Sequence, residues 1–377
     1  MSAWPGKYVI GLTGNIATGK SVVRKMLEHL GAYGIDADAL AHRAIAQDAP
    51  GYQPVIDTFG SWILTSGGQI DRTKLGKIVF SDVEALEKLE AIIHPLVRQA
   101  IDLLIRRASQ KIIVIEAIKL LEGELRQACD NIWVTTAPME IQLRRLRLKR
   151  GLSAEAARQR IAVQPPQAEK IEAANFVIKN SGSFEDTWKQ VLAAWQEIVS
   201  VEVLEPAQPS PAAKGKLVVE RAGPRQINEI AEFITEISNG RRAMSAADVM
   251  EAFGEKAFLL LKIDERLVGI AGWQVENLVA RVSDVYLEPG LPLGEAVRVL
   301  MKAIESASRE LQSEVLLLFL PPHLGRHNAV WDALGYSPRT PQELRVNAWE
   351  EAALESMPVG TVMFYKQLRK DRVLKPV

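Results

Sequence analysis

The sequence predicts an α/β fold, in which a parallel sheet is flanked by helices and carries an inserted helical lobe and a lid, followed by a second, α+β domain. Through the first 200 residues, short apolar runs typical of buried parallel strands alternate with longer segments of helical periodicity. After a proline-rich stretch, several strands follow one another before a long helix, which indicates a different sheet. We therefore expect a domain over residues 1–200, a linker over 201–216 and a domain over 217–377.

The composition restricts the classes of function. Lysine plus arginine and aspartate plus glutamate both number 46, so no overall field attracts nucleic acid or an anionic membrane. The single cysteine, Cys129, excludes an internal disulfide and a cysteine-based zinc cluster and is typical of a reducing compartment. No cationic leader precedes an apolar stretch, and no run approaches the roughly 18 residues of a membrane span. We expect a cytoplasmic protein that binds neither nucleic acid nor membrane, with its oligomeric state left open.

The first strand and the first helix enclose a glycine-rich loop. An apolar run at Tyr8–Leu12 leads into GNIATGKS, residues 14–21, which matches the pattern Gly, any four residues, Gly-Lys-Ser/Thr. In this pattern the loop amides and the start of the helix hold phosphates, the lysine reaches the β and γ phosphates, and the serine hydroxyl binds Mg²⁺. We therefore predict a P-loop NTPase fold that uses ATP and Mg²⁺, with Lys20 as a catalytic cation and Ser21 as the metal ligand. The residues expected to contact the nucleotide are Gly14, Asn15, Ile16, Ala17, Thr18, Gly19, Lys20, Ser21 and Val22.

A second short strand, expected at residues 32–35, delivers Asp36 and Asp38 to the start of a helix. Ligands of open α/β sheets bind at the carboxyl ends of the strands. One aspartate suffices to cap the helix, which leaves the other for chemistry. We predict that Asp38 is the general base and that it also contacts the substrate.

Two longer segments interrupt the alternation of strands and helices. Residues 50–110 are mostly helical and too long for one crossover helix, so we expect an inserted lobe that holds the second substrate. Residues 139–170 form helices rich in arginine. Most of these cations should be solvated, but such a hairpin can close as a lid and bring guanidinium groups to a transferring phosphoryl group. The candidate catalytic cations in this lid are Arg145 and Arg150.

Further strands are expected at residues 111–116, 131–136 and 175–179. A helix over residues 184–199 then ends the first domain. Its Trp188 and Trp195 recur at helical spacing, so we expect them in the core rather than at a ligand.

Several motifs of the first 199 residues occur in the order found in dephospho-CoA kinases, which this segment resembles. They are Leu12 to Ser21, Ile35 to Asp38, Phe59-Gly60, Asp71-Arg72, Ile93-His94-Pro95, Leu120-Leu121-Glu122, Gly151-Leu152-Ser153, Gln164 and Phe176 to Asn180. The resemblance implies transfer of the γ-phosphoryl group of ATP to the ribose 3′-hydroxyl of dephospho-CoA, the last step of coenzyme A biosynthesis. It also implies contacts of dephospho-CoA with His94, Arg98 and Glu122, although a histidine before proline at a helix start serves equally as a structural residue.

The segment departs from the family pattern at a few positions. Asn15 and Ala17 stand where glycine is usual, and residues 116–119 replace the usual approach to Glu122. Lys149 and Arg150 stand where arginine followed by an acid or amide is usual. The catalytic cation of the lid is therefore left open among Arg145, Lys149 and Arg150.

Residues 217–370 are similar, more distantly, to GCN5-related N-acetyltransferases (GNAT). The order of the expected strands and helices carries this resemblance, together with residues 328–336 and 363–368. The expected loop for a CoA pyrophosphate, residues 287–296 with Gly290 and Gly294, lacks the usual Arg-Gly-x-Gly core, and Pro292 offers no N–H. Three roles stay open: acetyl transfer, a GNAT-like module that binds acetyl-CoA or CoA and senses the product, and a structural appendage.

The phosphate loop predicts ATP but not the acceptor. A P-loop kinase for another small alcohol or nucleotide is therefore an alternative. A regulatory module that binds ATP and has an acetyltransferase-like output is a second, and an acetyltransferase with a vestigial kinase half is a third. The intact Lys20, Ser21 and Asp38 argue against the third.

Overall fold

The structure is a computed structural model that describes residues 4–79, 81–201, 215–240, 242–344, 346–370 and 373. The chain divides into two compact units. The first comprises Met1–Ile35, Ser109–Gly272 and Tyr286–Leu300, and the second comprises Asp36–Ala108, Trp273–Val285 and Met301–Val377. Each unit combines segments from both halves of the sequence, and the domain boundaries expected from the sequence stay a prediction. Most of the expected linker, residues 202–214, lies outside the described residues.

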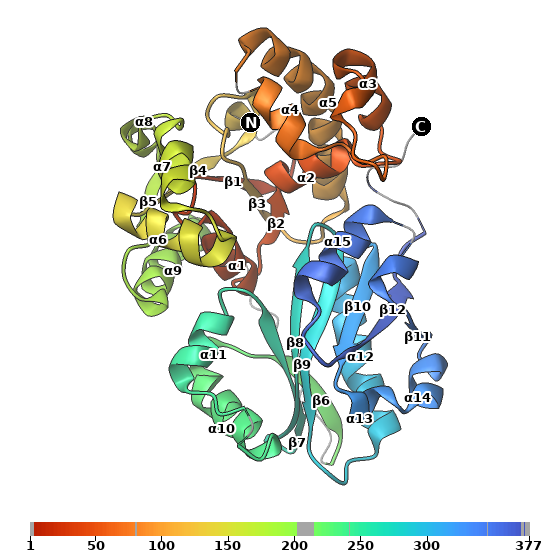
Figure 1. Cartoon of the computed structure of the whole chain (residues 1–377). Helices are drawn as coiled ribbons and strands as arrows, with labels where there is room; N and C mark the ends of the chain where they lie inside the picture. Colours follow the sequence, from red (N-terminus) through yellow and green to blue (C-terminus); the bar gives the residue numbers. More distant parts are fainter. Residues whose placement is uncertain are drawn as a thin grey trace. The chain divides into compact units, whose positions relative to one another are not determined.

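The first sheet has the strand order β2-β3-β1-β4-β5 (Figure 1). Strand β1 pairs in parallel with both β3 and β4, and β4 pairs in parallel with β5, as the continuous apolar runs predict. The central place of β1 puts the phosphate loop in the middle of the sheet's carboxyl edge. The strands are β1 (Tyr8–Thr13), β2 (Tyr33–Asp36), β3 (Ile112–Glu116), β4 (Asn131–Thr136) and β5 (Phe176–Lys179).

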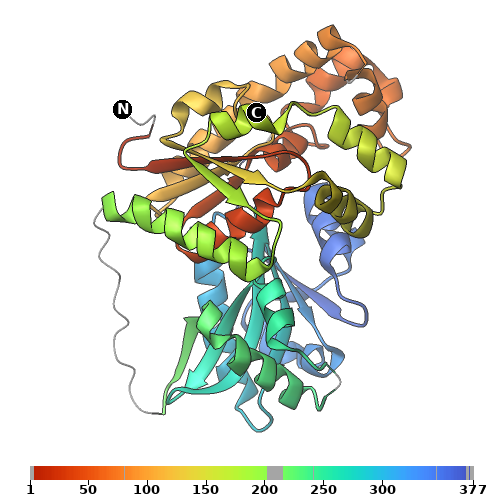
Figure 2. The same cartoon turned by 90° about the vertical axis from the view of Figure 1, so that its left-hand side faces the viewer.

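Helices α1 (Lys20–His29) and α9 (Phe184–Val201) pack on this sheet in one apolar core (Figure 2). Trp195 is buried in that core and Trp188 packs against it, which confirms the expectation for both tryptophans. The basic segment forms α6 (Met139–Arg150), α7 (Ala154–Ala162) and α8 (Gln167–Glu172), as predicted for a lid.

The inserted lobe lies in the second unit. It consists of α3 (Tyr52–Phe59), α4 (Arg72–Val79) and α5 (Val83–Arg107), which share a core that includes Val55, Leu75 and Leu89. Helix α2 (Ala37–Ala44) precedes the lobe, and Ile45 at its end joins that core. The expectation that His94 begins a helix is wrong. His94 and Pro95 lie inside α5, because Asp82 caps this helix more than two turns earlier.

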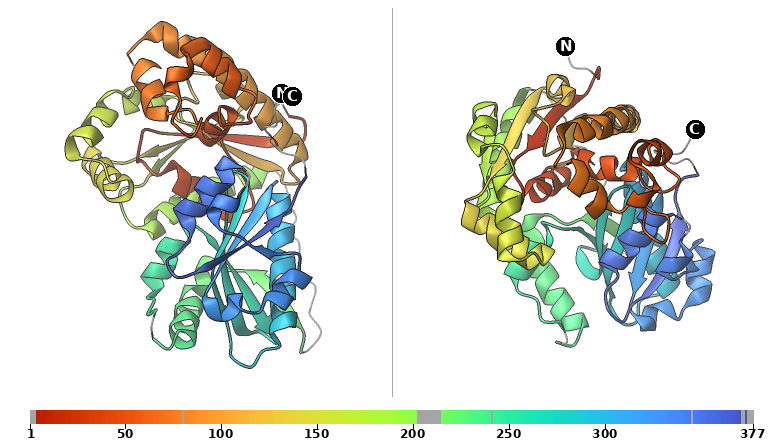
Figure 3. Two further views of the ribbon diagram at one scale, coloured as in Figure 1. Left: turned by 45° about the vertical axis from the view of Figure 1, so that its right-hand side comes forward. Right: turned by 45° about the horizontal axis from the view of Figure 1, so that its top comes forward.

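The second sheet has the order β11-β12-β10-β9-β8-β7-β6. The expected strands are present in sequence order, with the addition of the short β11. The strands are β6 (Leu217–Arg221), β7 (Ala257–Ile263), β8 (Arg266–Glu276), β9 (Val279–Leu287), β10 (Val315–Leu320), β11 (Ser337–Pro338) and β12 (Val362–Gln367). The neighbouring residues Leu260 and Leu261 of β7 face opposite sides of the sheet. Leu260 belongs to the core formed with α10 (Ile227–Ile237) and α11 (Ala246–Ala252), and Leu261 to the core formed with α12 (Leu293–Glu310). The ribbons of these helices can be followed by their colours in Figure 3.

Helix α12 begins at Leu293, as expected, so Gly294 lies in its first turn and only Gly290 lies in the preceding loop. Helix α15 was not predicted, and it packs Trp349, Ala352 and Ala353 against the strands β10 and β12. The helices are α10 (Ile227–Ile237), α11 (Ala246–Ala252), α12 (Leu293–Glu310), α13 (Pro322–Gly325), α14 (Asn328–Ala333) and α15 (Asn347–Ser356).

Candidate active site

The phosphate loop has a backbone that only glycine can adopt at two positions. Gly14 has φ +147° and Gly19 has φ +99°, both in the left-handed region. A Cβ atom on Gly14 would lie 2.5 Å from the carbonyl oxygen of Thr135, and one on Gly19 would lie 1.8 Å from Nδ2 of Asn180. The backbone of Ala17 is also left-handed, with φ 58°, at a position where the family pattern usually has glycine.

Lys20 lies against the loop that it is predicted to serve. Its buried ammonium donates to the carbonyl oxygens of Gly14, at 3.1 Å, and Asn15, at 3.5 Å. The ammonium therefore lies against the backbone of the loop that is predicted to bind the phosphates.

The loop is covered by the segment between α7 and α8, which sequence reasoning did not include in the site. The amide of Ile16 donates to Oε1 of Gln164 at 2.6 Å, and Nδ2 of Asn15 donates to the carbonyl oxygen of Pro165 at 3.1 Å. Within the described residues, the buried Oδ1 of Asn15 has no hydrogen-bond partner. The side chain of Gln164 thus accepts the hydrogen bond that the amide of Ile16 would donate to a phosphate oxygen. In the sequence, Gln164 was indicated only by its place in a family motif.

Arg145 of α6 contacts the outer side of the loop. Its guanidinium donates to the carbonyl oxygens of Ala17, at 3.1 Å, and Asn180, at 3.0 Å. Burial lowers the pKa of Arg145, and the neighbouring Arg144 lowers it further. Lys149 and Arg150 end the same helix, but their side chains lie outside the described residues. The choice among the three lid cations therefore stays open.

Glu116, at the carboxyl end of β3, was not predicted as a site residue. Its Oε1 accepts a hydrogen bond from the hydroxyl of Ser21 at 2.9 Å, and its Oε2 accepts one from Nε of Arg24 at 2.7 Å. The position of a carboxylate directly after an apolar strand was a usable signal, because that strand neighbours β1 in the sheet.

Asp36 and Asp38 have different surroundings. Asp36 is the N-cap of α2, and its carboxylate accepts from the amide of Ala39 at 2.8 Å. Asp38 lies in the first turn of that helix and is half-buried. Capping therefore does not require Asp38, and its predicted catalytic role stays a prediction.

The remaining predicted substrate residues are exposed. His94 and Arg98 lie on α5, four residues apart and hence on one face of the helix. Glu122 lies 3.9 Å from the ammonium of Lys170, which is buried and donates to the carbonyl oxygen of Ile118. The loop, Arg145 and Glu122 belong to the first unit, whereas Asp38, His94 and Arg98 belong to the second.

The donors near the loop suit magnesium. The hydroxyl of Ser21 and the carboxylate of Glu116 are hard oxygen groups of the kind that Mg²⁺ prefers. In the described part of the chain, no three histidine, cysteine or acidic side chains gather into a metal-binding group of their own. A magnesium ion would therefore be held mainly through Ser21 and the nucleotide's phosphates.

Two further findings concern predictions of absence. None of the described helices has the length and apolar character needed to cross a bilayer.

Cys129 is half-buried, and burial, followed by the charge of Asp130, raises the pKa of its thiol to about 12. Its sulfur lies 3.1 Å from the carbonyl oxygen of Leu125, which suits a packing role rather than a nucleophile.

Comparisons with known proteins agree with the geometry of the first half of the chain. The family model for dephospho-CoA kinase matches residues 8–186. The dephospho-CoA kinase of Carboxydothermus hydrogenoformans is 45% identical over 192 residues, which are 50% of this chain and 93% of that protein. The dephospho-CoA kinase of Aquifex aeolicus is 43% identical over 190 residues, 50% of this chain and 96% of that protein.

Solved structures match each half of the chain. TT1252 from Thermus thermophilus is 32% identical, has a TM-score of 0.46 and covers 51% of this chain and 98% of its own. An acetyltransferase of the GNAT family from Staphylococcus aureus Mu50 is 15% identical, has a TM-score of 0.33 and covers 41% of this chain and 100% of its own.

Proposed function

Because this chain belongs to the dephospho-CoA kinase family, we propose that it transfers the γ-phosphoryl group of ATP to the ribose 3′-hydroxyl of dephospho-CoA, giving CoA and ADP. The observation that carries the proposal is the phosphate loop, with its two obligatory glycines and with the ammonium of Lys20 bound to its backbone. The cytoplasmic location expected from the sequence stays a prediction.

Catalysis of this reaction is mainly a matter of positioning and charge stabilisation, because the transition state of phosphoryl transfer is loose. The loop amides and the start of α1 would bind the phosphates, and the ammonium of Lys20 would move from the carbonyl oxygen of Gly14 to the γ-phosphoryl oxygens. Asp38 would accept the proton of the attacking hydroxyl. Gln164 would leave the amide of Ile16 as the triphosphate enters.

Magnesium fits the same site. Mg²⁺, when bound, neutralises charge on the β and γ phosphates. The hydroxyl of Ser21 would hold the ion while donating its proton to Glu116, the carboxylate that accepts from it at 2.9 Å.

The arginines of the lid would have separate tasks. Arg145 is bonded to the carbonyl oxygens of Ala17 and Asn180, so we assign it to bracing the loop. Arg150 then becomes the main candidate for the cation that approaches the γ-phosphoryl group, with Lys149 beside it in the sequence. Dephospho-CoA would contact His94, Arg98 and Glu122.

An acceptor panel tests the proposal. The whole chain is incubated with Mg-ATP and, separately, with dephospho-CoA, nucleoside monophosphates and shikimate-like alcohols, and product masses are measured. We expect a phosphate to be added to dephospho-CoA alone. Faster phosphorylation of another acceptor would identify a different kinase, and ATP binding without any acceptor-dependent ADP release would indicate a regulatory module.

For the part beyond residue 217 we favour a bracing role over acetyl transfer. In the loop before α12, the carboxylate of Glu288 is held by Arg266 at 2.7 Å, and Glu295 lies in the first turn of the helix. The carboxylate of Glu295 would repel a pyrophosphate at a helix start that otherwise attracts one, and Arg266 is already engaged by Glu288. We expect no acetylated product when the whole chain is incubated with labelled acetyl-CoA and a panel of amines. Catalytic turnover there would restore acetyl transfer as a function.

A further inference from the structure

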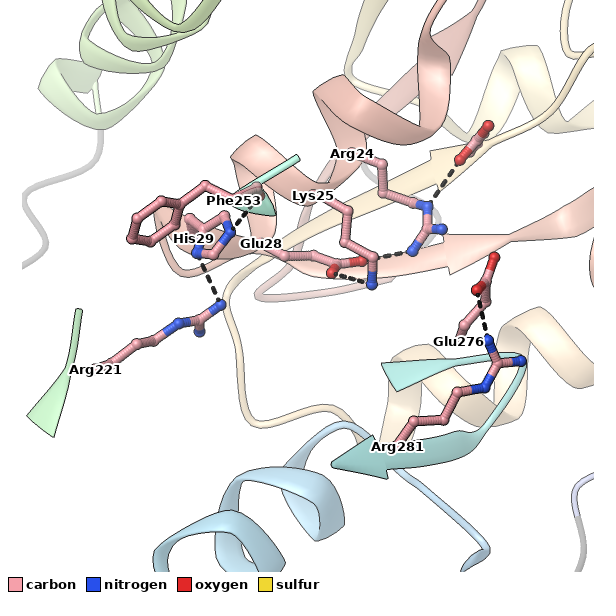
Figure 4. Close-up of polar contacts among 9 residues, drawn as sticks. Arg24, Lys25, Glu28, His29, Arg221, Phe253, Glu276 and Arg281 are labelled. Carbon is pink, nitrogen blue, oxygen red and sulfur yellow. Dashed lines mark hydrogen bonds and ion pairs between the residues drawn. The ribbon is translucent and has the colours of Figure 1, made fainter. Parts of the chain in front are cut away.

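Helix α1 carries a buried chain of charged side chains that leads away from the phosphate loop. The guanidinium of Arg24 donates through Nε to Glu116, at 2.7 Å, and through Nη1 to Glu28, at 2.6 Å. The ammonium of Lys25 donates to the other oxygen of Glu28 at 3.0 Å. Figure 4 labels Arg24, Lys25 and Glu28 along the helix. The side chains of Arg24, Glu28 and Glu116 are each at most 10% exposed.

The network is tightly enclosed. Gly34 of β2 lies so close that a Cβ atom there would be 2.1 Å from Oε1 of Glu28 and 3.0 Å from Cγ of Arg24. The guanidinium therefore has little freedom to leave its two carboxylates. Burial alone would raise the pKa of Glu28, but the charges and hydrogen bonds of Lys25 and Arg24 more than offset it and hold that pKa below its usual value.

The same carboxylate that binds Arg24 also binds the predicted magnesium ligand. Glu116 accepts the hydroxyl of Ser21 through Oε1 and Arg24 through Oε2. The carboxylate of Glu116 cannot rotate about its Cγ–Cδ bond without losing one of these two hydrogen bonds. Arg24, whose Nε and Nη1 form a fork between Glu116 and Glu28, thereby fixes the direction from which Glu116 accepts the hydrogen bond of Ser21.

We propose that Arg24 is a positioning residue for magnesium binding, because it orients Glu116, which in turn aims the hydroxyl of Ser21 at the metal. This inference rests on the proposed function only for the premise that the loop binds a magnesium nucleotide. It predicts that replacing Arg24 weakens nucleotide binding when Mg²⁺ is present and leaves binding without the metal largely unchanged.

Calorimetric titration of ADP tests the proposal without any catalytic turnover. For each protein, the dissociation constant is measured with excess Mg²⁺ and again with EDTA, and the EDTA value divided by the Mg²⁺ value gives the contribution of the metal. We expect Arg24→Met to lower this ratio about tenfold or more, as the loss of a charge-assisted hydrogen bond would. The dissociation constant of this variant for ADP in EDTA should change less than threefold. Arg24→Lys, which keeps the charge without the fork, should give an intermediate ratio.

Lys25→Met is the matched control. Lys25 neighbours Arg24 on α1 and shares its partner Glu28, so this variant removes a cation from the same network while leaving Arg24 and Glu116 in place. We expect its ratio to stay within about twofold of the original protein. An equal fall in both variants, or an unchanged ratio in Arg24→Met, would overturn the proposal. Should Arg24→Met not fold, as judged by circular dichroism, an Arg24→Lys ratio equal to the original would overturn it. A failure of the original protein to bind ADP would instead refute the phosphate-loop function.

Discussion

Replacing His29 with glutamine tests the contact at the end of α1. Nε2 of His29 lies 3.0 Å from the carbonyl oxygen of Phe253 and therefore carries a proton, and Nδ1 accepts from the guanidinium of Arg221 at 3.3 Å. The neutral ring satisfies both partners. A second proton, on Nδ1, would face the donor of Arg221. Burial and the charge of Arg221 accordingly lower the pKa of His29 from 6.5 to about 4, although Phe253 and Glu28 oppose that change.

The size of the change in unfolding free energy follows from the linkage between protonation and folding. The unfolded chain takes up a proton on His29 below about pH 6.5, whereas the folded chain resists until about pH 4. The stability contributed by the neutral ring is therefore complete above pH 6.5 and is lost as the pH falls toward 4. At about 1.4 kcal/mol for each pKa unit, the full loss is about 3.5 kcal/mol, of which about 2 kcal/mol appears by pH 5.

The assay compares the original protein with His29→Gln, whose amide can donate to Phe253 and accept from Arg221 without titrating. Unfolding free energies from urea titrations should be similar at pH 7.5, and the original protein should lose about 2 kcal/mol relative to the variant at pH 5. Ring resonances give a direct check, because the chain has only five histidines. A ring of His29 that titrates near pH 6.5, or two proteins whose stabilities fall in parallel, would refute the reasoning.

Three further predictions concern the loop, the base and the second unit. Asp38→Asn should lower kcat by about 10²–10⁴-fold, and Lys20→Ala should lower it further, with substrate affinities measured as the control. Full turnover in Asp38→Asn would show that Asp38 is not the general base. Arg43→Met should destabilise the second unit by about 3–5 kcal/mol in denaturant unfolding, because the buried carboxylate of Glu314 loses the cation that lies 2.8 Å away and keeps only neutral donors. Adding Glu314→Gln should restore part of that loss. Ala17→Gly should raise the unfolding free energy by about 0.5–1 kcal/mol, because it removes a left-handed alanine, and a measured decrease would show that this backbone is not strained.

The sequence predicted the sheet better than the helices around it. Strands such as β1 and β3 are continuous apolar runs, and burial on both faces allows no other pattern. Helix α15 escaped prediction because Ala352 and Ala353 supply much of its buried face, and alanine gives only a weak apolar signal. Pro95 was misread as a helix start because proline fits that position well. Packing along the length of α5 instead retains it inside the helix.

The candidate site was predictable where it is local in sequence. The glycines, Lys20 and Ser21 occur within one motif, and the structure confirms that Gly14 and Gly19 adopt conformations that require glycine. Gln164 and Glu116 could not be placed by spacing, since they contact Ile16 and Ser21 across 148 and 95 residues. Arg24 looked like an ordinary helix residue in a row of polar positions. Only the approach of β3 to α1 makes it the partner of a buried carboxylate.

Contacts from beyond residue 217 hold the helices that carry the predicted chemistry. In the first unit, α1 begins with Lys20 and ends at His29, which is bound by Arg221 and Phe253. In the second unit, α2 carries Asp38 in its first turn. Near its other end, Arg43 forms a buried ion pair with Glu314. A helix fixed at its last turn transmits that restraint to its first, because the backbone hydrogen bonds between them are continuous. The C-terminal part can therefore contribute to phosphoryl transfer as a brace, even though its own loop before α12 is poorly suited to a pyrophosphate.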